Sequence, residues 1–235
     1  DYFLRLPGKR IRPLIAMITA ENYGGTYQKA LPAALAIEIL HDFTLVHDEV
    51  MDDDSFRRGF ETVHNKWDVG TAILSGDAMV AIAYQKILES ESKYLEQMIR
   101  LFTDGMYIVC AGQALDKEFE TEMSISHDLY MKMISQKTAR LISLPFELGY
   151  LAVADEIPYL SQLTEIGKKI GLAFQIQDDL LDFIADKDKL GKDIGSDWRQ
   201  KKKTFITINY HQFAVKDKAF PTNLFDIPHF DTVLD

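Results

Sequence analysis

Two short acidic segments are the clearest indication of chemistry in this sequence. The first is Asp48-Glu49-Val50-Met51-Asp52, and the second is Asp178-Asp179-Leu180-Leu181-Asp182. Each places acids at positions i, i+1 and i+4 at the end of an apolar helical pattern. Residues i and i+4 of a helix lie one turn apart on the same face. Two carboxylates in this arrangement suit Mg²⁺, which prefers a few carboxylates together with water and phosphate oxygens.

A solvent-exposed acidic helix face is the ordinary interpretation of one such segment. Two copies with the same spacing, each in a strongly apolar helix, favour two metal-holding faces instead, because clustered like charges repel one another without a cation. A helical wheel places each group of acids in a polar stripe. One stripe contains His41, Thr44, Asp48 and Asp52, and the other contains Lys168, Gly171, Gln175, Asp178 and Asp182.

Basic residues occur at defined positions in this acidic chain. Arginine suits bidentate contacts with phosphate, and lysine suits contacts with a point charge. Basic side chains beside carboxylates that bind Mg²⁺ are what a diphosphate site needs, although solvated surface lysines are the ordinary interpretation of Lys201 and Lys203. The clusters are Gly8-Lys9-Arg10-Ile11-Arg12-Pro13, with Lys9 and Arg12 on one face of the first predicted helix, Arg57-Arg58-Gly59, Lys137-Thr138, Gly191-Lys192-Asp193 and Lys201-Lys202-Lys203-Thr204.

Long helices are expected to position these residues. The seven prolines leave residues 33–144 and 159–220 without any, and apolar residues recur there at helical intervals. Convincing strand alternation is absent from the sequence. We therefore predict an all-α fold, a bundle of long helices, with connections at 23–26, 52–62 and 187–196 and an irregular tail at 212–235. The predicted helices are 9–22, 28–50, 64–90, 93–119, 127–152, 158–186 and 197–211.

Composition narrows the class of protein. The chain has 235 residues, of which 47% are hydrophobic, and no linker is visible, so a single domain over 1–235 is expected. A net charge of -10 argues against binding nucleic acid or an anionic membrane. No apolar run reaches the roughly 18 residues of a membrane span, and the lone Cys110 favours a reducing, cytoplasmic setting. Because the chain begins at Asp1 rather than Met, we expect its ends to be trimmed.

In combination, these segments resemble the trans-isoprenyl diphosphate synthases, the polyprenyl synthetase family. His47 to Asp52, followed by Arg57-Arg58-Gly59, resembles the family's first aspartate-rich region, and Phe174 to Asp182 resembles the second. Glu49 stands where the family usually has an aspartate. It points about 100° away from Asp48, so it need not be a metal ligand. Further matches, in the family's order over about 8–204, are Gly8 to Pro13, Gly76-Asp77-Ala78, Gly112-Gln113, Lys137-Thr138 and Gly191-Lys192-Asp193.

The resemblance implies an all-helical fold around a central cavity, acting as a homodimer. It implies that isopentenyl diphosphate is joined to an allylic diphosphate, with Mg²⁺ required as three ions per active site. Carried over by position, Asp48, Asp52 and Asp178 would bind the metal, and Asp182 would be a further ligand or a supporting group. The allylic diphosphate would be held by Arg57, Lys137, Thr138, Gln175, Lys192 and Lys202. Isopentenyl diphosphate would be held by Lys9, Arg12, His41 and Arg58. The catalytic set would be Asp48, Asp52, Arg57, Lys137, Asp178 and Lys192.

Product length is expected to depend on residues that precede Asp48 on its helix, because the prenyl chain grows away from the metals. Leu40 and Thr44 lie two turns and one turn back, and Phe43 lies five residues back. In the family an aromatic residue at this fifth position is a common floor of the cavity, although Phe43 as an ordinary core residue is an equally open interpretation. The resemblance favours geranylgeranyl diphosphate as the product, with farnesyl diphosphate as the alternative.

Two other functions are alternatives to chain elongation. Terpene cyclases also ionise diphosphates with an acidic segment, but they typically lack a second Asp-Asp-x-x-Asp segment and the Gly-Lys-Arg segment. A non-catalytic partner subunit of a heteromeric prenyl synthase usually loses one acidic segment, whereas both are present here. The sequence therefore favours a Mg²⁺-dependent, short-chain prenyltransferase.

Overall fold

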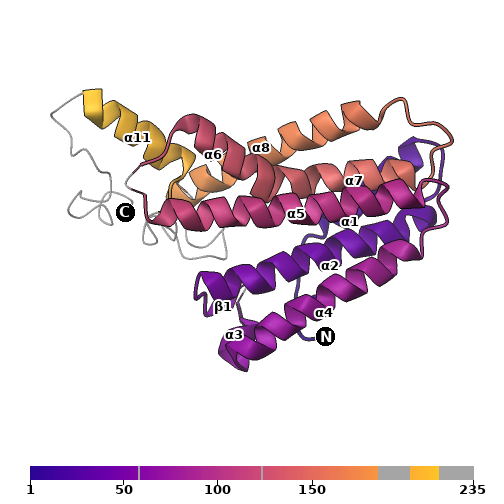
Figure 1. Ribbon diagram of the computed structural model, residues 1–235, viewed down its shortest axis with the longest axis horizontal. Coiled ribbons are helices and arrows are strands. Elements are labelled where there is room, and N and C mark those ends of the chain that lie inside the picture. The colour runs from indigo at the N-terminus through magenta and orange to yellow at the C-terminus, as the bar shows by residue number, and fades with distance from the viewer. Residues whose placement is uncertain (58, 123, 185–201, 217–235) are drawn as a thin grey trace. The chain divides into compact units, whose positions relative to one another are not determined.

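The computed structural model describes residues 1–57, 59–122, 124–184 and 202–216 (Figure 1). Helices make up nearly all of the regular structure in these residues, so the predicted all-α fold is confirmed. The helical elements are η1 (Phe3–Arg5), α1 (Ile11–Asn22), α2 (Tyr27–Met51), α3 (Val63–Lys66), α4 (Val69–Leu88), α5 (Leu95–Glu120), α6 (His127–Ile134), η2 (Ser135–Ala139), α7 (Arg140–Leu151), α8 (Leu160–Ile184) and α11 (Phe205–Lys216). Two short strands, β1 (Phe56–Arg57) and β2 (Phe60–Glu61), complete the described elements.

The chain forms two compact units. The first comprises residues 1–107 and 140–168, and the second comprises 108–139 and 169–235. The boundaries fall inside α5 and α8 and between η2 and α7. The first acidic segment therefore belongs to the first unit, and the second acidic segment belongs to the second unit.

Helix α2 is the central element of the first unit, where it packs against α1, α4 and α7. Its buried residues include four alanines and Leu40, and small side chains let neighbouring helices approach closely. By length and composition α2 is apolar enough to cross a membrane, which the sequence reading did not anticipate. Half of its most apolar window is buried inside the protein, and the core helix of a globular protein meets the same criterion.

The connection after α2 is a small hairpin rather than an irregular loop. Strands β1 and β2 pair in antiparallel register, with Phe56 opposite Glu61 and Arg57 opposite Phe60. Gly59 lies in the turn with a φ of +81°, a conformation that glycine adopts at little cost. The buried Thr62 hydroxyl donates to the carbonyl of Asp54 over 2.7 Å and closes the base of the loop. Because each strand has only two residues, no alternation in the sequence reveals them.

Several predicted helix boundaries differ from the structure. The predicted helix 64–90 is interrupted after Lys66, because Asp68 caps α4 by accepting the N–H of Thr71 over 2.8 Å. The predicted helix 127–152 contains a π-helical turn, η2, between α6 and α7. In the described part of the last predicted helix, 202–204 are not helical, and α11 continues to Lys216.

The N-terminal basic cluster is also arranged differently from the prediction. Helix α1 begins at Ile11, after Arg10 in a left-handed conformation with a φ of +49°. Lys9 therefore precedes the helix, and the expectation that Lys9 and Arg12 share a helix face is wrong. Arg10 instead joins the N-terminal segment to α2. Its guanidinium donates to Glu38 over 2.6 Å and to the carbonyl of Leu6 over 2.8 Å.

Helices α5, α6, α8 and α11 contribute residues to the core of the second unit. Phe205 and Ile208 of α11 pack with residues of the other three helices, so the beginning of α11 is attached to this core. The buried members of the cluster are Phe119, Ile125, Tyr130, Met133, Ile134 and Ile208. These contacts position the second acidic segment relative to α6 and α11.

Candidate active site

The first acidic segment forms the last turn of α2. The N–H of Asp52 donates to the carbonyl of Asp48 over 2.9 Å, so the two residues lie one helical turn apart. Both side chains are partly exposed. The helix ends at Met51 with Asp52 as its C-cap. Asp53 follows with a φ of +54°, and the N–H of Asp54 donates to the carbonyl of Glu49. This ending keeps the Asp48 and Asp52 carboxylates on one accessible face.

Glu49 lies on the buried side of the same turn. Its side chain is completely buried and forms an ion pair with Arg57 of β1. Burial raises the pKa of Glu49 to about 7, and the charge of Arg57 opposes this shift. The wheel already placed Glu49 away from Asp48. The structure adds that Glu49 holds Arg57, one of the residues expected to bind the allylic diphosphate.

The other α2 residues singled out from the sequence lie on two sides of the helix. His41 and Thr44 are partly exposed, like Asp48 and Asp52, and the Thr44 hydroxyl donates to the carbonyl of His41 over 2.7 Å. Leu40 is fully buried. Phe43 is partly buried against a cluster that includes Phe3, Val46 and Met79 of the first unit, and its ring lies 4.7 Å from that of His47. The role of Leu40, Phe43 and Thr44 as a floor stays a prediction.

The second acidic segment shows the same division between its acids. Asp178 and Asp182 are partly exposed, whereas Asp179 is only 4% exposed. Asp179 accepts hydrogen bonds from the Tyr130 hydroxyl (2.6 Å), the Gln175 amide (2.9 Å) and the backbone N–H of Phe205 (3.0 Å). Burial raises the pKa of Asp179, and these three donors oppose the shift. The structure therefore places Asp179, which lies between Asp178 and Asp182 in the sequence, inside the second unit.

Lys137 and Thr138 lie in the π-helical turn η2, between α5 and α8. The Lys137 amine donates to Asp116 of α5 over 2.6 Å, and the Thr138 hydroxyl donates to Gln175 of α8 over 2.6 Å. Glycines permit this close approach on both sides. A Cβ atom at Gly112 would lie 2.3 Å from the backbone nitrogen of Lys137, and one at Gly171 would lie 2.4 Å from the Cα of Ala139. A π turn inside a helix is often found at a functional site.

The carboxylates fit Mg²⁺ as paired ligands rather than as a complete cage. Among the residues that the structure describes, no three His, Cys, Asp or Glu side chains gather closely enough to bind a metal ion by themselves. Mg²⁺ usually binds one or two carboxylates and completes its octahedron with water and substrate phosphate oxygens. The accessible pairs Asp48–Asp52 and Asp178–Asp182 match this requirement, each within its own unit.

The remaining predicted ligands are placed less completely. Lys9 is exposed just before α1, and Arg12 is partly buried in the first turn of α1. Lys202 is partly exposed three residues before α11. Arg58 and Lys192 lie outside the described residues.

The sequence reading missed Asp116, which accepts a hydrogen bond from the predicted site residue Lys137, and Tyr130, which donates one to Asp179. Asp116 could have been found from its spacing. It lies four residues, or one turn, after Gly112, whose segment had been singled out. No comparable sequence pattern marks Tyr130, because a tyrosine at helical spacing is ordinarily interpreted as a core residue.

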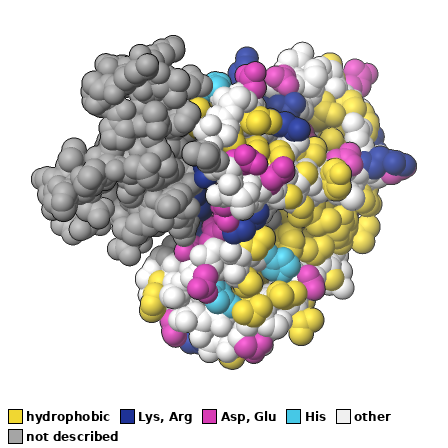
Figure 2. Space-filling model, turned by 60° about the vertical axis from the view of Figure 1, so that its left-hand side comes forward, with side chains coloured by type: hydrophobic (Ala, Val, Ile, Leu, Met, Phe, Trp, Pro, Cys, Tyr) yellow, Lys and Arg dark blue, Asp and Glu magenta, His cyan; other side chains and the backbone are white. Residues whose placement is uncertain are grey.

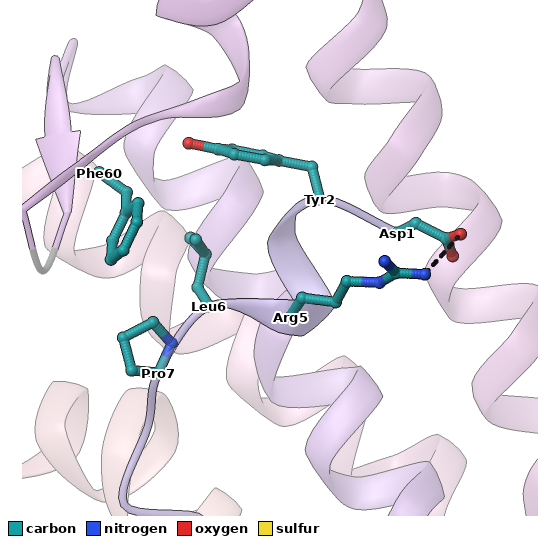
Figure 3. A pocket seen from close by; sticks show the side chains of 6 residues that line it. All are labelled: Asp1, Tyr2, Arg5, Leu6, Pro7 and Phe60. Atoms are coloured by element: carbon teal, nitrogen blue, oxygen red, sulfur yellow. Dashed lines mark ion pairs between the residues drawn. The ribbon is translucent and has the colours of Figure 1, made fainter.

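A pocket in the first unit lies beside the N-terminal segment and the hairpin (Figure 3). Its lining residues are Asp1, Tyr2, Arg5, Leu6, Pro7 and Phe60. Arg5 and Asp1 form an exposed ion pair of 3.7 Å there. None of the lining residues belongs to the predicted site, so we place no part of the active site in this pocket.

Comparisons with known proteins identify relatives of the chain as a whole. The chain is 40% identical over 215 residues to a geranylgeranyl diphosphate synthase of Sulfolobus acidocaldarius, covering 90% of this chain but 65% of that protein. It is 38% identical to a geranylgeranyl pyrophosphate synthase of Geoglobus acetivorans, covering 93% of this chain and 69% of that protein. The structure resembles a crystal structure of a geranylgeranyl pyrophosphate synthase with a TM-score of 0.89 at 37% identity, over 99% of this chain and 72% of the other. The family model for polyprenyl synthetase matches residues 1–226. With both acidic segments, the helical fold and this match together, the chain belongs to the polyprenyl synthetase family.

Proposed function

We propose that the protein is a Mg²⁺-dependent, short-chain trans-prenyltransferase that condenses isopentenyl diphosphate with an allylic diphosphate, head to tail. The observation that carries the proposal is the division of acids in both segments. In each, the acids at i and i+4 are accessible and the acid at i+1 is buried. Two accessible carboxylate pairs, accompanied by Arg57, Lys137 and Thr138, suit a substrate with two phosphate groups.

In this proposal Mg²⁺ would be held by Asp48, Asp52, Asp178 and Asp182, as three ions per active site. When bound, it supplies positive charge that stabilises a diphosphate leaving group. The protein has no need of a nucleophilic side chain for such a reaction. Its acidic residues would bind Mg²⁺ and orient the diphosphate, and its basic residues would neutralise the charge of the diphosphate.

The side chains would act by stabilising charge on the departing diphosphate. Arg57, held by Glu49, and Lys137, held by Asp116, are already fixed in position, and fixed charges stabilise a transition state without reorganising. Loss of diphosphate leaves an allylic cation. The double bond of isopentenyl diphosphate attacks it, a carbon–carbon bond forms, and a proton leaves to the released diphosphate. Gln175 and Thr138 would orient the diphosphate, with Lys192 and Lys202 as further contacts. Lys9, Arg12, His41 and Arg58 would hold isopentenyl diphosphate.

The direct test is to incubate the chain with isopentenyl diphosphate and dimethylallyl, geranyl or farnesyl diphosphate, with and without Mg²⁺, and to size the products by chromatography. We expect elongation only with Mg²⁺, and a loss of at least about a hundredfold in rate for Asp48→Asn, comparable to removing one electrostatic stabiliser. The exposed Asp104→Asn in α5 is the matched control and should leave the rate unchanged. Absence of metal-dependent elongation with every primer would overturn the proposal.

Activity that appears only when a second, different subunit is added would instead favour a non-catalytic partner of a heteromeric synthase. The presence of both accessible carboxylate pairs argues against that outcome.

For the product we propose geranylgeranyl diphosphate, which is the product named for the Sulfolobus and Geoglobus relatives. Phe43 packs against the first unit's apolar cluster and would limit the depth available to the growing chain. In the same assay, the wild type should stop at twenty carbons, and Phe43→Ala should make longer products. A wild-type product of fifteen carbons would identify a farnesyl diphosphate synthase, and an unchanged length in Phe43→Ala would remove Phe43 from the floor.

We also propose that both units belong to one prenyltransferase domain that functions as a cytoplasmic homodimer without a membrane span. The family match runs through both units, and the chain has a single cysteine. Helix α4 supports the homodimer, since Val69, Ile73, Leu74 and Ile82 are all exposed. Figure 2 shows hydrophobic side chains gathered over part of the molecular surface, and a large exposed apolar patch typically marks an interface.

A further inference from the structure

We propose that Asp179 is a positioning residue rather than a metal ligand, and that it fixes two separate contacts for the allylic diphosphate. One is the Thr138–Gln175 pair, and the other is the segment around Lys202 that leads into α11. This inference rests on the proposed function for its substrate, but the contacts that carry it are present in the protein alone.

Three donors surround the Asp179 carboxylate, which can accept about four hydrogen bonds. Its Oδ2 accepts from the Tyr130 hydroxyl and the Phe205 N–H, and its Oδ1 accepts from the Gln175 amide. With 4% of its surface exposed, the carboxylate has no open side for a hydrated metal ion. Three donors around one buried carboxylate favour its ionised form and hold it firmly.

Asp179 determines how Gln175 faces Thr138. A carboxylate accepts hydrogen bonds and donates none, so Gln175 must present its NH₂ group to Asp179. Its carbonyl oxygen Oε1 then faces the other way, where it accepts the Thr138 hydroxyl over 2.6 Å. The two predicted diphosphate contacts are therefore held in one orientation through the buried acid.

Asp179 also fixes the beginning of α11. Phe205 is the first residue of this helix, and its N–H is one of the groups that have no partner within the helix. A carboxylate at a helix N-terminus is favourable for the helix dipole as well. The Phe205 ring packs near those of His127 and Tyr130, so the same cluster anchors the backbone and the side chain.

The beginning of α11 in turn holds Lys202. The N–H of Thr204 donates to the Thr207 hydroxyl over 2.9 Å, and that hydroxyl shares its hydrogen between the carbonyls of Thr204 (3.1 Å) and Lys202 (3.2 Å). The backbone at Lys202 is thus tied to the first turn of α11, which Asp179 anchors. Loss of Asp179 should loosen both the lysine and the Thr138–Gln175 pair.

The first acidic segment supplies an independent parallel. There the acid at i+1, Glu49, is also buried and holds a predicted diphosphate ligand, Arg57. In both segments the middle acid faces inward and positions a basic or polar contact. The outer acids remain available to a metal.

The test compares Asp179→Asn with Asp178→Asn by amide hydrogen exchange, without Mg²⁺ or substrate. An asparagine at 179 offers one oxygen to three donors. We therefore expect the amides of residues 205–209 to exchange about tenfold faster or more in Asp179→Asn, as for loss of a hydrogen bond to a charged acceptor. Asp178→Asn, on the accessible face, should leave their exchange unchanged. Unchanged exchange in Asp179→Asn would overturn the proposal even if the protein has no prenyltransferase activity.

Steady-state kinetics separate positioning from metal binding and from a purely structural role. Asp179→Asn should raise the KM for the allylic diphosphate by about tenfold, while the KM for isopentenyl diphosphate and the Mg²⁺ midpoint stay near wild type. Asp178→Asn should shift the Mg²⁺ midpoint. A Mg²⁺ midpoint shifted equally by both variants would make Asp179 a metal ligand and refute the inference.

Tyr130→Phe is a milder variant if Asp179→Asn does not fold. It removes one donor to Asp179 and keeps the ring in the apolar cluster. It should accelerate exchange at 205–209 in the same direction, by a smaller factor. No acceleration in a folded Tyr130→Phe protein would count against the anchoring role.

Discussion

Glu49 and Asp179 show how one residue's direction on a helix decides its chemistry. Each is adjacent in sequence to a predicted metal ligand, yet a rotation of about 100° carries it from an accessible face into the core. Burying an acid costs free energy of desolvation unless a hydrogen-bond donor or a cation compensates the loss of water. Arg57 compensates Glu49, and three donors compensate Asp179.

The raised pKa of Glu49 predicts a pH dependence of stability. Because its pKa rises to about 7 in the folded protein from an ordinary value of 4.5, the folded state keeps a proton that the unfolded chain loses in that interval. The free energy of unfolding should therefore fall as pH rises through this window, by up to about 3 kcal/mol for such a shift. Urea unfolding in Mg²⁺-free buffer at about pH 5 and about pH 7.5 measures it.

Glu49→Gln is the matched control for this pH dependence. Glutamine cannot ionise, so the variant should lose the part of the slope that Glu49 contributes, while other titrating groups contribute equally to both proteins. Identical slopes for the wild type and Glu49→Gln would show that Glu49 does not titrate in this range.

Asp53 predicts a stabilising substitution next to the site. It follows the C-cap of α2 with a φ of +54°, where glycine is the usual residue. Asp53→Gly should relieve the left-handed strain and raise the free energy of unfolding by about 0.5–1 kcal/mol, less than the full strain because glycine gains entropy when unfolded. Glu89→Gly, at the C-cap of α4 with a φ of −74°, should instead destabilise. A lower free energy of unfolding in Asp53→Gly would mean that the Asp53 side chain stabilises the fold by more than its left-handed conformation destabilises it.

At the scale of elements, η2 depends on its two glycine neighbours. Gly112→Ala would place a Cβ atom 2.3 Å from the backbone nitrogen of Lys137. Since a backbone cannot move as a side-chain tip does, we expect a loss of about 1–3 kcal/mol in the free energy of unfolding and a raised KM for the allylic diphosphate. Chemical denaturation and steady-state kinetics check both effects.

Gly105→Ala in the same helix is the control for Gly112→Ala. There the nearest atom is a Leu144 methyl at 3.2 Å, which can adjust, and alanine favours the helix by about 1 kcal/mol. Gly105→Ala should therefore be neutral or stabilising. Equal effects at the two positions would indicate that helix propensity, and not the approach of η2, governs Gly112.

The elements also show what the sequence could predict. The long helices α2, α5 and α8 follow from continuous apolar spacing, and the polar stripe through His41, Thr44 and Asp48 is accessible as the wheel indicated. The break before α4 did not follow, because the Asp68 cap sits inside an otherwise helical pattern. Contacts between distant residues, such as Tyr130 with Asp179 at 49 positions' separation, carry no local signal. The two-residue strands that bring Arg57 to Glu49 likewise leave no recognisable pattern in the sequence.

At the scale of the whole molecule, the net charge of -10 does not reveal how acidic and basic residues are grouped. In the first unit Arg57 pairs with the buried Glu49, and in the second unit Lys137 pairs with Asp116. Neither the fold nor the net charge alone would indicate a diphosphate site. The same molecule also presents an apolar face on α4. That helix has two charged residues, Asp77 and Lys86, among its twenty, whereas a solvated helix usually carries many more.

The exposed face of α4 therefore predicts where two copies of the chain meet. Leu74 is 69% exposed, and Leu74→Glu would place a charge in the interface that the homodimer proposal requires, at a cost that dissociates the pair. Sedimentation velocity should give a dimer for the wild type and a monomer for Leu74→Glu. Ile18→Glu is the control, because Ile18 is 54% exposed on α1 and should leave the dimer intact. If Ile18→Glu dissociates the dimer and Leu74→Glu does not, the contact lies on α1. A monomeric wild type would remove the homodimer while leaving the chemistry of each acidic pair to be judged by the elongation assay.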